Sequence, residues 1–215
     1  MWSIKSKLLK QILPKSTDRA FFVGMTGCGK TTLAEIACNE KKYVVVLDTK
    51  GEINWKGYHL HETLSTLAKD KHPKLIYRPN PYELHDEDAI DKFFKWVYTR
   101  ENTTVYIDEV YSITSNNNIP FHLLACLTRG RSKNICVYSS SQRPKDLPQT
   151  LMSEAENYYV FKLNMPQDRK KIYDITGIKD DDMFSLKKRF FIYANVETGA
   201  SNPLSLTLRK VEQTI

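Results

Sequence analysis

The sequence predicts an α/β protein, in which a mostly parallel β-sheet is flanked by helices and carries an antiparallel addition at its C-terminal end. Three observations predict this fold. Short apolar runs alternate with amphipathic helical segments along most of the chain. The run Tyr43–Leu47 is apolar at every position, as in a parallel strand that is buried on both faces. A glycine-rich turn follows the first apolar run and opens a helix.

The composition is that of a globular protein with a basic excess. The 215 residues are 41% hydrophobic and 27% charged, and 32 Lys and Arg against 25 Asp and Glu give a formal charge of +7. This excess indicates either a polyanionic partner or simply a basic surface. No apolar run approaches the roughly 20 residues of a membrane-spanning helix. The four cysteines show no metal-ligand spacing, so free thiols in a reducing compartment are expected rather than a zinc site or disulfides.

We expect a single domain over residues 1–215, with three parts. Residues 1–18 form a basic amphipathic segment, 19–165 the nucleotide-binding core, and 166–215 a C-terminal helix and hairpin. Within the first part, an apolar stripe that includes Leu8 and Ile12 lies among lysines, and Pro14 ends the helix. Such a helix either packs its stripe on its own domain or acts as an arm for membrane or nucleic acid.

The elements follow in order along the chain. Strands are predicted at Ala20–Val23, Tyr43–Leu47, Lys74–Tyr77, Thr104–Ile107, Ile135–Ser139 and Tyr158–Leu163. Helices are predicted from near Gly29, after a cap at Asp86, at Pro120–Thr128 and at Gln167–Ile175. A terminal hairpin is predicted from Phe190–Ala194 and Leu204–Leu208, which flank the turn at Thr198-Gly199.

The first chemical motif is a phosphate-binding loop that matches GxxxxGK[ST] at every fixed position. It comprises Gly24, Met25, Thr26, Gly27, Cys28, Gly29, Lys30 and Thr31, and Thr32 follows it. Glycines let successive backbone N–H groups point at one phosphate, and the following helix adds its dipole. We expect Lys30 to bridge the β- and γ-phosphates and Thr31 to offer its hydroxyl to Mg²⁺. The alternative, a glycine turn with an incidental lysine, is disfavoured by the flanking strand and helix.

The second motif is an apolar strand that ends in two adjacent acids, Asp108 and Glu109. Ligands of parallel sheets bind at the carboxyl ends of the strands, so these acids are placed to meet a phosphate and a metal ion. We expect Asp108 to hold Mg²⁺ through its water shell and Glu109 to activate a water for attack on the γ-phosphate. The alternative is two solvated acids in a loop.

The third motif is Val137 to Pro144, in which a strand again delivers polar groups to the carboxyl edge and Gln142 can hydrogen-bond the γ-phosphate or the attacking water. The fourth is Arg129-Gly130-Arg131, at the end of the preceding helix. These arginines either cap that helix and meet solvent or supply a neighbouring subunit with an arginine finger, for which Arg131 is favoured over Arg129.

These segments together resemble the FtsK–HerA superfamily of DNA-pumping ATPases. The resemblance covers about residues 20–145. Besides the phosphate loop, it is carried by VVVLDTKGE (Val44–Glu52), VYIDE (Val105–Glu109) and LTRGRSKNICVYSSSQRP (Leu127–Pro144). Its discriminating parts are the hydrophobic-D-x-K-x-E segment after the second strand and the SQRP ending. The short chain is similar to the genome-packaging ATPases of icosahedral double-stranded DNA viruses with internal membranes. No separate DNA-binding module follows the core. The polar stretch Ser112–Asn118 is therefore either a pore loop or a solvated loop.

The resemblance implies a RecA-like (ASCE) P-loop NTPase core that assembles into a homo-oligomeric ring and hydrolyses Mg·ATP between subunits. It also implies translocation of double-stranded DNA without sequence preference into a preformed capsid. The expected location is the cytoplasm of the infected cell, with association at a virion vertex or with membrane-associated packaging proteins. The rivals are a small-molecule kinase, a filamentous-phage assembly ATPase, and a slowly hydrolysing nucleotide switch. Adjacent carboxylates fit the kinase poorly, because kinases hold an acceptor rather than activate water.

Overall fold

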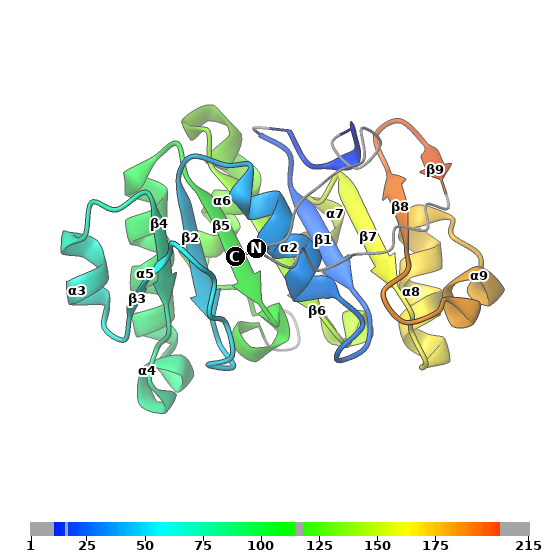
Figure 1. Ribbon diagram of the computed structural model, residues 1–215, viewed down its shortest axis with the longest axis horizontal. Helices are drawn as coiled ribbons and strands as arrows, with labels where there is room; N and C mark the ends of the chain where they lie inside the picture. The colour runs from blue at the N-terminus through cyan, green and yellow to red at the C-terminus, as the bar shows by residue number, and fades with distance from the viewer. Residues whose placement is uncertain (1–10, 16, 115–117, 203–215) are drawn as a thin grey trace, which may run out of the picture.

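One continuous β-sheet forms the centre of the molecule (Figure 1). The computed structural model describes residues 11–15, 17–114 and 118–202. Within these residues the sheet has nine strands in the order β3-β4-β2-β5-β6-β1-β7-β8-β9. The strands are β1 (Ala20–Val23), β2 (Val44–Asp48), β3 (His59–His61), β4 (Lys74–Tyr77), β5 (Thr104–Asp108), β6 (Cys136–Ser141), β7 (Asn157–Phe161), β8 (Phe191–Asn195) and β9 (Ala200–Asn202).

The helices occupy the connections between these strands. The α-helices are α2 (Lys30–Asn39), α3 (Leu64–Lys69), α4 (Pro81–His85), α5 (Glu87–Arg100), α6 (Phe121–Arg129), α7 (Gln149–Ser153), α8 (Pro166–Thr176) and α9 (Asp180–Ser185). Three 3₁₀ turns are η1 (Val110–Ile113), η2 (Gly130–Lys133) and η3 (Pro144–Asp146). In the described part of the chain, no helix is both long and apolar enough to cross a membrane.

The sheet confirms the predicted fold class. Neighbouring strands from β3 to β7 are parallel, whereas β8 pairs antiparallel with both β7 and β9. The register aligns Asp48 with Asp108 and Val23 with Ser141, so the strands that carry the motifs end at the same edge. Ligands of parallel sheets gather at this carboxyl edge, which here collects the glycine loop, the two acids and Gln142.

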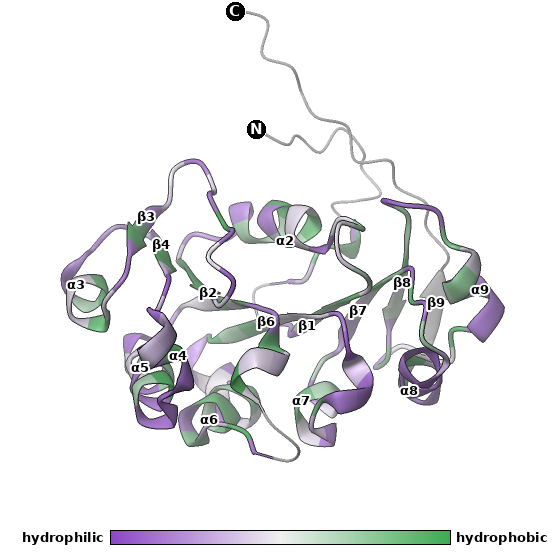
Figure 2. Ribbon diagram, turned by 90° about the horizontal axis from the view of Figure 1, so that it is seen from below, coloured by the Kyte–Doolittle hydropathy of each residue, from purple (hydrophilic) through white to green (hydrophobic). Residues whose placement is uncertain are grey.

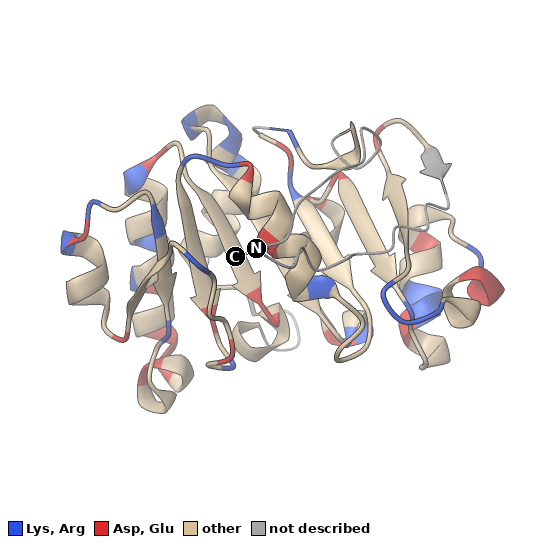
Figure 3. Ribbon diagram, in the orientation of Figure 1, with Lys and Arg blue, Asp and Glu red and all other residues tan. Residues whose placement is uncertain are grey.

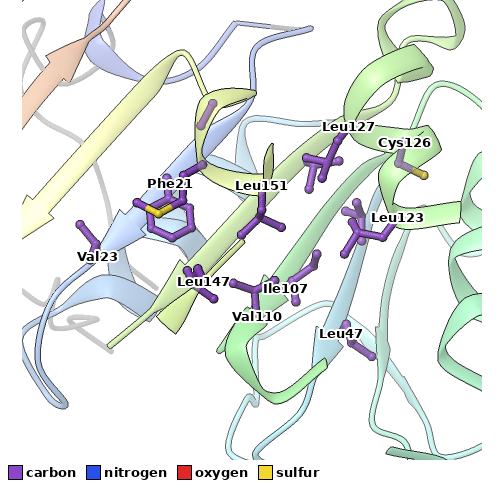
Figure 4. Packing of buried hydrophobic residues seen from close by; sticks show 14 of the residues in the cluster. Phe21, Val23, Leu47, Ile107, Val110, Leu123, Cys126, Leu127, Leu147 and Leu151 are labelled. Atoms are coloured by element: carbon purple, nitrogen blue, oxygen red, sulfur yellow. The ribbon is translucent and has the colours of Figure 1, made fainter. Parts of the chain in front are cut away.

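Two layers of helices cover the sheet, as the view along its edge shows (Figure 2). Helix α2 covers one face, and α5, α6, α7 and α8 cover the other. Alternate residues of β1 divide between the two apolar clusters, because successive strand side chains point to opposite faces. Phe21 packs on the face of α6 and α7 together with Leu123 and Leu151 (Figure 4), while Phe22 packs on the face of α2 with Leu33.

The strands and helices predicted between residues 20 and 194 are confirmed, with boundaries shifted by a few residues. Asp86 caps α5 as expected, because its carboxylate accepts hydrogen bonds from the backbone N–H groups of Asp88 and Ala89. The elements that the sequence did not predict are β3, α3, α4, α7 and α9, none longer than six residues. Such short segments contain too few turns or alternations to give a periodic pattern.

The predictions for the two ends of the chain are only partly covered by the described residues. The second hairpin strand begins at Ala200 in the structure, earlier than predicted, and 204–208 lie outside the described residues. Most of the predicted N-terminal helix also lies outside them. Ile12, at its end, is buried in the cluster on the α2 face, and its carbonyl accepts a hydrogen bond from the hydroxyl of Tyr159. This part of the apolar stripe packs on its own domain.

Candidate nucleotide site

The glycine loop is held between the ends of two strands that flank β1. The backbone N–H of Gly24 donates to the carbonyl of Ser141, the last residue of β6, at 3.2 Å. That of Met25 donates to the carbonyl of Lys162, just after β7, at 3.0 Å. Gly24 has φ +151°, and a Cβ there would lie 2.5 Å from the Cβ of Phe161. The first glycine is therefore required both by the backbone conformation and by the close approach of β7.

Lys30, the first residue of α2, curls back over the loop that precedes it. Its Nζ donates to the carbonyls of Gly24 and Met25, at 2.7 and 2.9 Å, and its side chain is buried. Burial lowers the pKa of Lys30, and the nearby charge of Lys50 adds to that lowering, whereas Glu109 opposes it. Phosphate oxygens are stronger partners for an ammonium than neutral carbonyls, so this lysine is suited to bind a phosphate seated in the loop.

Asp108 ends β5 beside the start of α2. Its Oδ1 lies 3.5 Å from the hydroxyl of Thr31 and accepts hydrogen bonds from Tyr106 at 3.0 Å and Ser140 at 3.2 Å. Burial raises the pKa of Asp108, and the hydrogen bond from Tyr106 counteracts this effect. A hydroxyl and a carboxylate at this separation supply the hard oxygen ligands that Mg²⁺ prefers. The two predicted magnesium ligands thus come together, and their chemistry fits the ion.

Glu109 follows Asp108 with φ 55° and ψ 69°, a left-handed conformation that points it away from the course of β5. Its Oε1 accepts from the hydroxyl of Ser141 at 2.9 Å and from the backbone N–H of Gln142 at 3.1 Å. Its Oε2 pairs with Nζ of Lys50 at 3.0 Å. Glu109 is a buried carboxylate whose orientation is fixed by the end of β6 and by the loop after β2.

Gln142 lies at the mouth of the same site, as predicted from its place after β6. Its side-chain Oε1 accepts a hydrogen bond from the hydroxyl of Thr26 at 2.6 Å. This contact links the phosphate loop to the residue whose backbone N–H holds Glu109. The remaining predicted loop residues, from Gly27 to Thr32, lie in the turn and in the first turn of α2.

Lys50 is a residue of this site that the sequence reasoning did not single out. The loop that carries it is shaped by Asp48, whose carboxylate accepts from the N–H groups of Gly51 and Ile53 and from Nε of Arg78. Asp48 therefore has a structural role, while Lys50 pairs with Glu109 just after β5. The feature of the sequence that could have indicated Lys50 is its position two residues after a buried strand that ends in an acid.

The arginines of the fourth motif lie at the opposite edge of the sheet. Arg129 ends α6 and Arg131 lies in η2, so both precede β6 and belong to the amino edge of the sheet. Figure 1 shows the end of α6 at this edge. Arg131 pairs with Glu156 at 2.6 Å, and the same carboxylate also binds Arg19. Arg129 is exposed and, within the described residues, its side chain forms no hydrogen bond or ion pair. Neither arginine lies near the phosphate loop of its own chain.

The candidate pore loop is described only in part. Residues 112–114 belong to the end of η1 and the residue after it, Asn118 donates a hydrogen bond to Glu87, and 115–117 lie outside the described residues. Both flanks line a cavity of about 430 Å³ together with the first turns of α5 and α6. The candidate pore loop begins at Ser112, four residues after Asp108, and so lies at the same edge of the sheet as the nucleotide site.

A cavity of about 590 Å³ adjoins the phosphate loop on the β7 side. It is lined by Met25–Cys28, by Lys162 and Asn164 after β7, and by residues 185–188 after α9. The N–H of Arg189 donates to the carbonyl of Cys28 at 3.1 Å, so the loop between α9 and β8 is hydrogen-bonded directly to the phosphate loop. Basic residues run along this loop, at the same edge as the acids of β5 (Figure 3).

A parallel sheet with a phosphate loop after β1, and with a carboxylate at the end of β5 that faces the hydroxyl of this loop's threonine, defines a P-loop nucleoside triphosphatase. The chain belongs to the ATPase family associated with various cellular activities (AAA), whose model matches residues 20–163. It binds ATP and is an ATP hydrolase. The fold class and the resemblance predicted from the sequence are confirmed.

The similar proteins include viral ones. The DNA packaging ATPase P9 of Enterobacteria phage PRD1 is 26% identical, over 91% of this chain and 88% of that protein. The genome packaging NTPase B204 of Sulfolobus turreted icosahedral virus 2, solved with ATP-γS, matches 91% of this chain and all of its own with TM-score 0.74 and 17% identity. VirB4 of Thermoanaerobacter pseudethanolicus matches 90% of each chain with TM-score 0.62 and 9% identity. The two structures show the shared fold.

Proposed function

We propose that this chain is an ATP-driven translocase of double-stranded DNA that packages a viral genome, and that it hydrolyses Mg·ATP at the interfaces of a homo-oligomeric ring. The similarity to phage PRD1 P9 along nearly the whole of both chains supports the packaging role. The observation that carries the ATPase chemistry is the buried Glu109, fixed beside Asp108 and the phosphate loop.

In this proposal each residue of the site has one task. The loop N–H groups and Lys30 hold the β- and γ-phosphates, and Thr31 and Asp108 hold Mg²⁺, directly or through water. The ion, when bound, neutralises the charge that develops on the phosphate oxygens. Glu109 takes a proton from a water whose oxygen bonds to the γ-phosphorus. The bond from that phosphorus to the bridging oxygen breaks, and its electron pair leaves with ADP.

The ribose and base have a candidate place in the cavity between Met25–Cys28 and residues 185–188. The basic loop that follows α9 lines it, and the hydrogen bond from Arg189 to Cys28 couples that loop to the phosphates. We assign the arginines of the fourth motif to a neighbouring subunit's site, because they lie across the sheet from their own phosphate loop. The sequence favours Arg131. Its pairing with Glu156 makes Arg129, whose side chain has no partner among the described residues, an equal candidate.

The formal charge of +7 supports a partner that is held through its phosphates. The proposed location is the cytoplasm of the infected cell and, after packaging starts, a vertex of the virion. The test is phosphate release from Mg·ATP without an acceptor, measured with and without duplex DNA. We expect stimulation by two unrelated duplexes alike, with affinity that falls steeply as salt rises. A marked sequence preference, or turnover only with a small-molecule acceptor, contradicts the proposal.

A further inference from the structure

Lys50 and Glu109 form an ion pair at the entrance of the nucleotide site. Their Nζ–Oε2 distance is 3.0 Å, and the side chains are 31% and 11% exposed. In the part of the chain that the structure describes, this is the one ion pair that either residue makes. The partly buried ammonium of Lys50 therefore lies against Glu109, the acid that we assign as the base.

The two oxygens of Glu109 have different environments. Oε1 accepts two hydrogen bonds from the end of β6, one of them from the backbone of Gln142, and these fix the carboxylate. Among the described residues, Oε2 is bound only by Lys50. Because Oε1 already accepts from two donors, Oε2 is the oxygen that could accept a proton from water. The ammonium of Lys50 occupies the place of that water.

The backbone on either side of Lys50 is anchored, whereas its side chain is not. The hydroxyl of Thr49 donates to the carbonyl of Asp108 at 2.5 Å, and the N–H of Gly51 donates to the carboxylate of Asp48 at 2.9 Å. Only the flexible four-carbon stem is left to move. Lys50 pairs with Glu109, the neighbour of Asp108, and the carboxylate of Asp108 lies 3.5 Å from the hydroxyl of Thr31 in the phosphate loop. A γ-phosphate held by this loop would therefore lie near Lys50.

We propose that Lys50 is a positioning residue that exchanges Glu109 for the γ-phosphate when ATP binds, and that this exchange opens Oε2 of Glu109 to the attacking water. The inference rests on the proposed role of Glu109 as the base. A triphosphate offers terminal oxygens that carry more negative charge than one carboxylate, so it competes successfully for the ammonium. ADP lacks that group and leaves Lys50 on Glu109. Lys50 thereby releases the base only when there is a γ-phosphate to attack.

The first test compares equilibrium affinities for two nucleotides, ADP and the non-hydrolysable AMPPCP, by calorimetry with Mg²⁺. For Lys50→Met we expect AMPPCP affinity to fall by about tenfold, the loss of one charge-assisted hydrogen bond, and ADP affinity to stay within twofold. Lys50→Arg should restore most of the difference. Lys56→Met removes the same charge from an exposed position in the same loop and should change neither affinity. Equal losses for both nucleotides, or no loss for either, would overturn the exchange.

The second test weakens one of the two groups that compete for Lys50, the carboxylate of Glu109. Glu109→Gln replaces the carboxylate by a neutral amide that holds Lys50 less strongly, so AMPPCP affinity should rise several-fold while ADP affinity does not. The rise should vanish in the Glu109→Gln, Lys50→Met double variant, because the two effects act through one ammonium. A rise that persists in the double variant refutes the exchange. Near-normal ATP turnover by Glu109→Gln would instead refute the base, so the two failures are distinguishable.

Discussion

The hydroxyl of Thr26 donates a hydrogen bond to the side-chain oxygen of Gln142 at 2.6 Å, which joins the tip of the phosphate loop to the end of β6. The backbone N–H of Gln142 in turn binds Glu109. A change in the phosphate loop on nucleotide binding therefore reaches the proposed base through one residue.

This link predicts a catalytic defect rather than a folding defect for Gln142→Ala. The backbone contact to Glu109 survives the change, but the amide that would meet the γ-phosphate or the water is lost. We expect turnover to fall by about tenfold or more, which corresponds to one hydrogen bond in the transition state. Steady-state kinetics measures it, and Thr26→Val is the control. If Gln142 acted only by bracing Thr26, the two variants would lose the same activity.

Lys30→Ala should abolish ATP hydrolysis while the protein still folds. Its ammonium is the buried positive charge within the loop, where it binds two carbonyls. Without it, the transition-state charge on the β- and γ-phosphate oxygens loses its main cationic partner. Phosphate release should fall to background, with an unchanged circular dichroism spectrum as the control. Near-normal turnover would show that the nucleotide does not use this loop.

The two adjacent acids should respond differently to neutral replacements. Glu109→Gln keeps the shape and the contact with Ser141, so it should bind Mg·ATP yet hydrolyse it at least a hundredfold more slowly, as expected when a general base is lost. Asp108→Asn should instead raise the Mg²⁺ concentration needed for half-maximal turnover. Magnesium titrations of ATPase activity separate the two effects. Equal and mild losses from both changes would contradict the division of tasks.

How far the sequence predicts this site depends on the range of each interaction. The loop, Asp108, Glu109 and Gln142 were predictable because each follows an apolar strand, and parallel strands end at a common edge. The contact between Lys50 and Glu109 was not, since it depends on β2 lying next to β5 although two other strands separate them in sequence. The pairing of Arg131 with Glu156 similarly spans 25 residues and a helix that the sequence did not predict.

The glycines of the loop offer a matched pair of substitutions. A Cβ at Gly24 would lie 2.5 Å from Phe161, whereas one at Gly27 would have no atom within 4 Å, although both residues have positive φ. Gly24→Ala must therefore displace β7 or the loop as well as strain the backbone, and we expect a loss of about 2 kcal/mol or more of unfolding free energy. Gly27→Ala should lose about 1 kcal/mol. Urea unfolding measures both, and equal losses would show that φ alone decides.

The last prediction concerns the arginines at the amino edge. If they only stabilise their own chain, mutation costs a little stability and leaves the catalysis of each folded molecule unchanged. Arg131 is half-exposed, and Glu156 keeps its contact with the buried Arg19 when Arg131 is removed, so the expected stability loss is below about 1 kcal/mol. An arginine that acts on the neighbouring site predicts a folded, assembled protein with poor turnover.

Mixing distinguishes these outcomes. Subunits with Arg129→Ala, and separately subunits with Arg131→Ala, are first assayed alone, and only the variant of the arginine that acts in trans should be inactive. That variant is then combined with Lys30→Ala subunits, which are also inactive alone. Mixed rings contain some interfaces in which an intact phosphate loop faces an intact arginine, so activity should partly return for the arginine that acts in trans. That arginine's side chain is thereby identified without a structure of the ring. Absence of recovery, with subunit exchange demonstrated by fluorescence energy transfer, would refute the arrangement in trans.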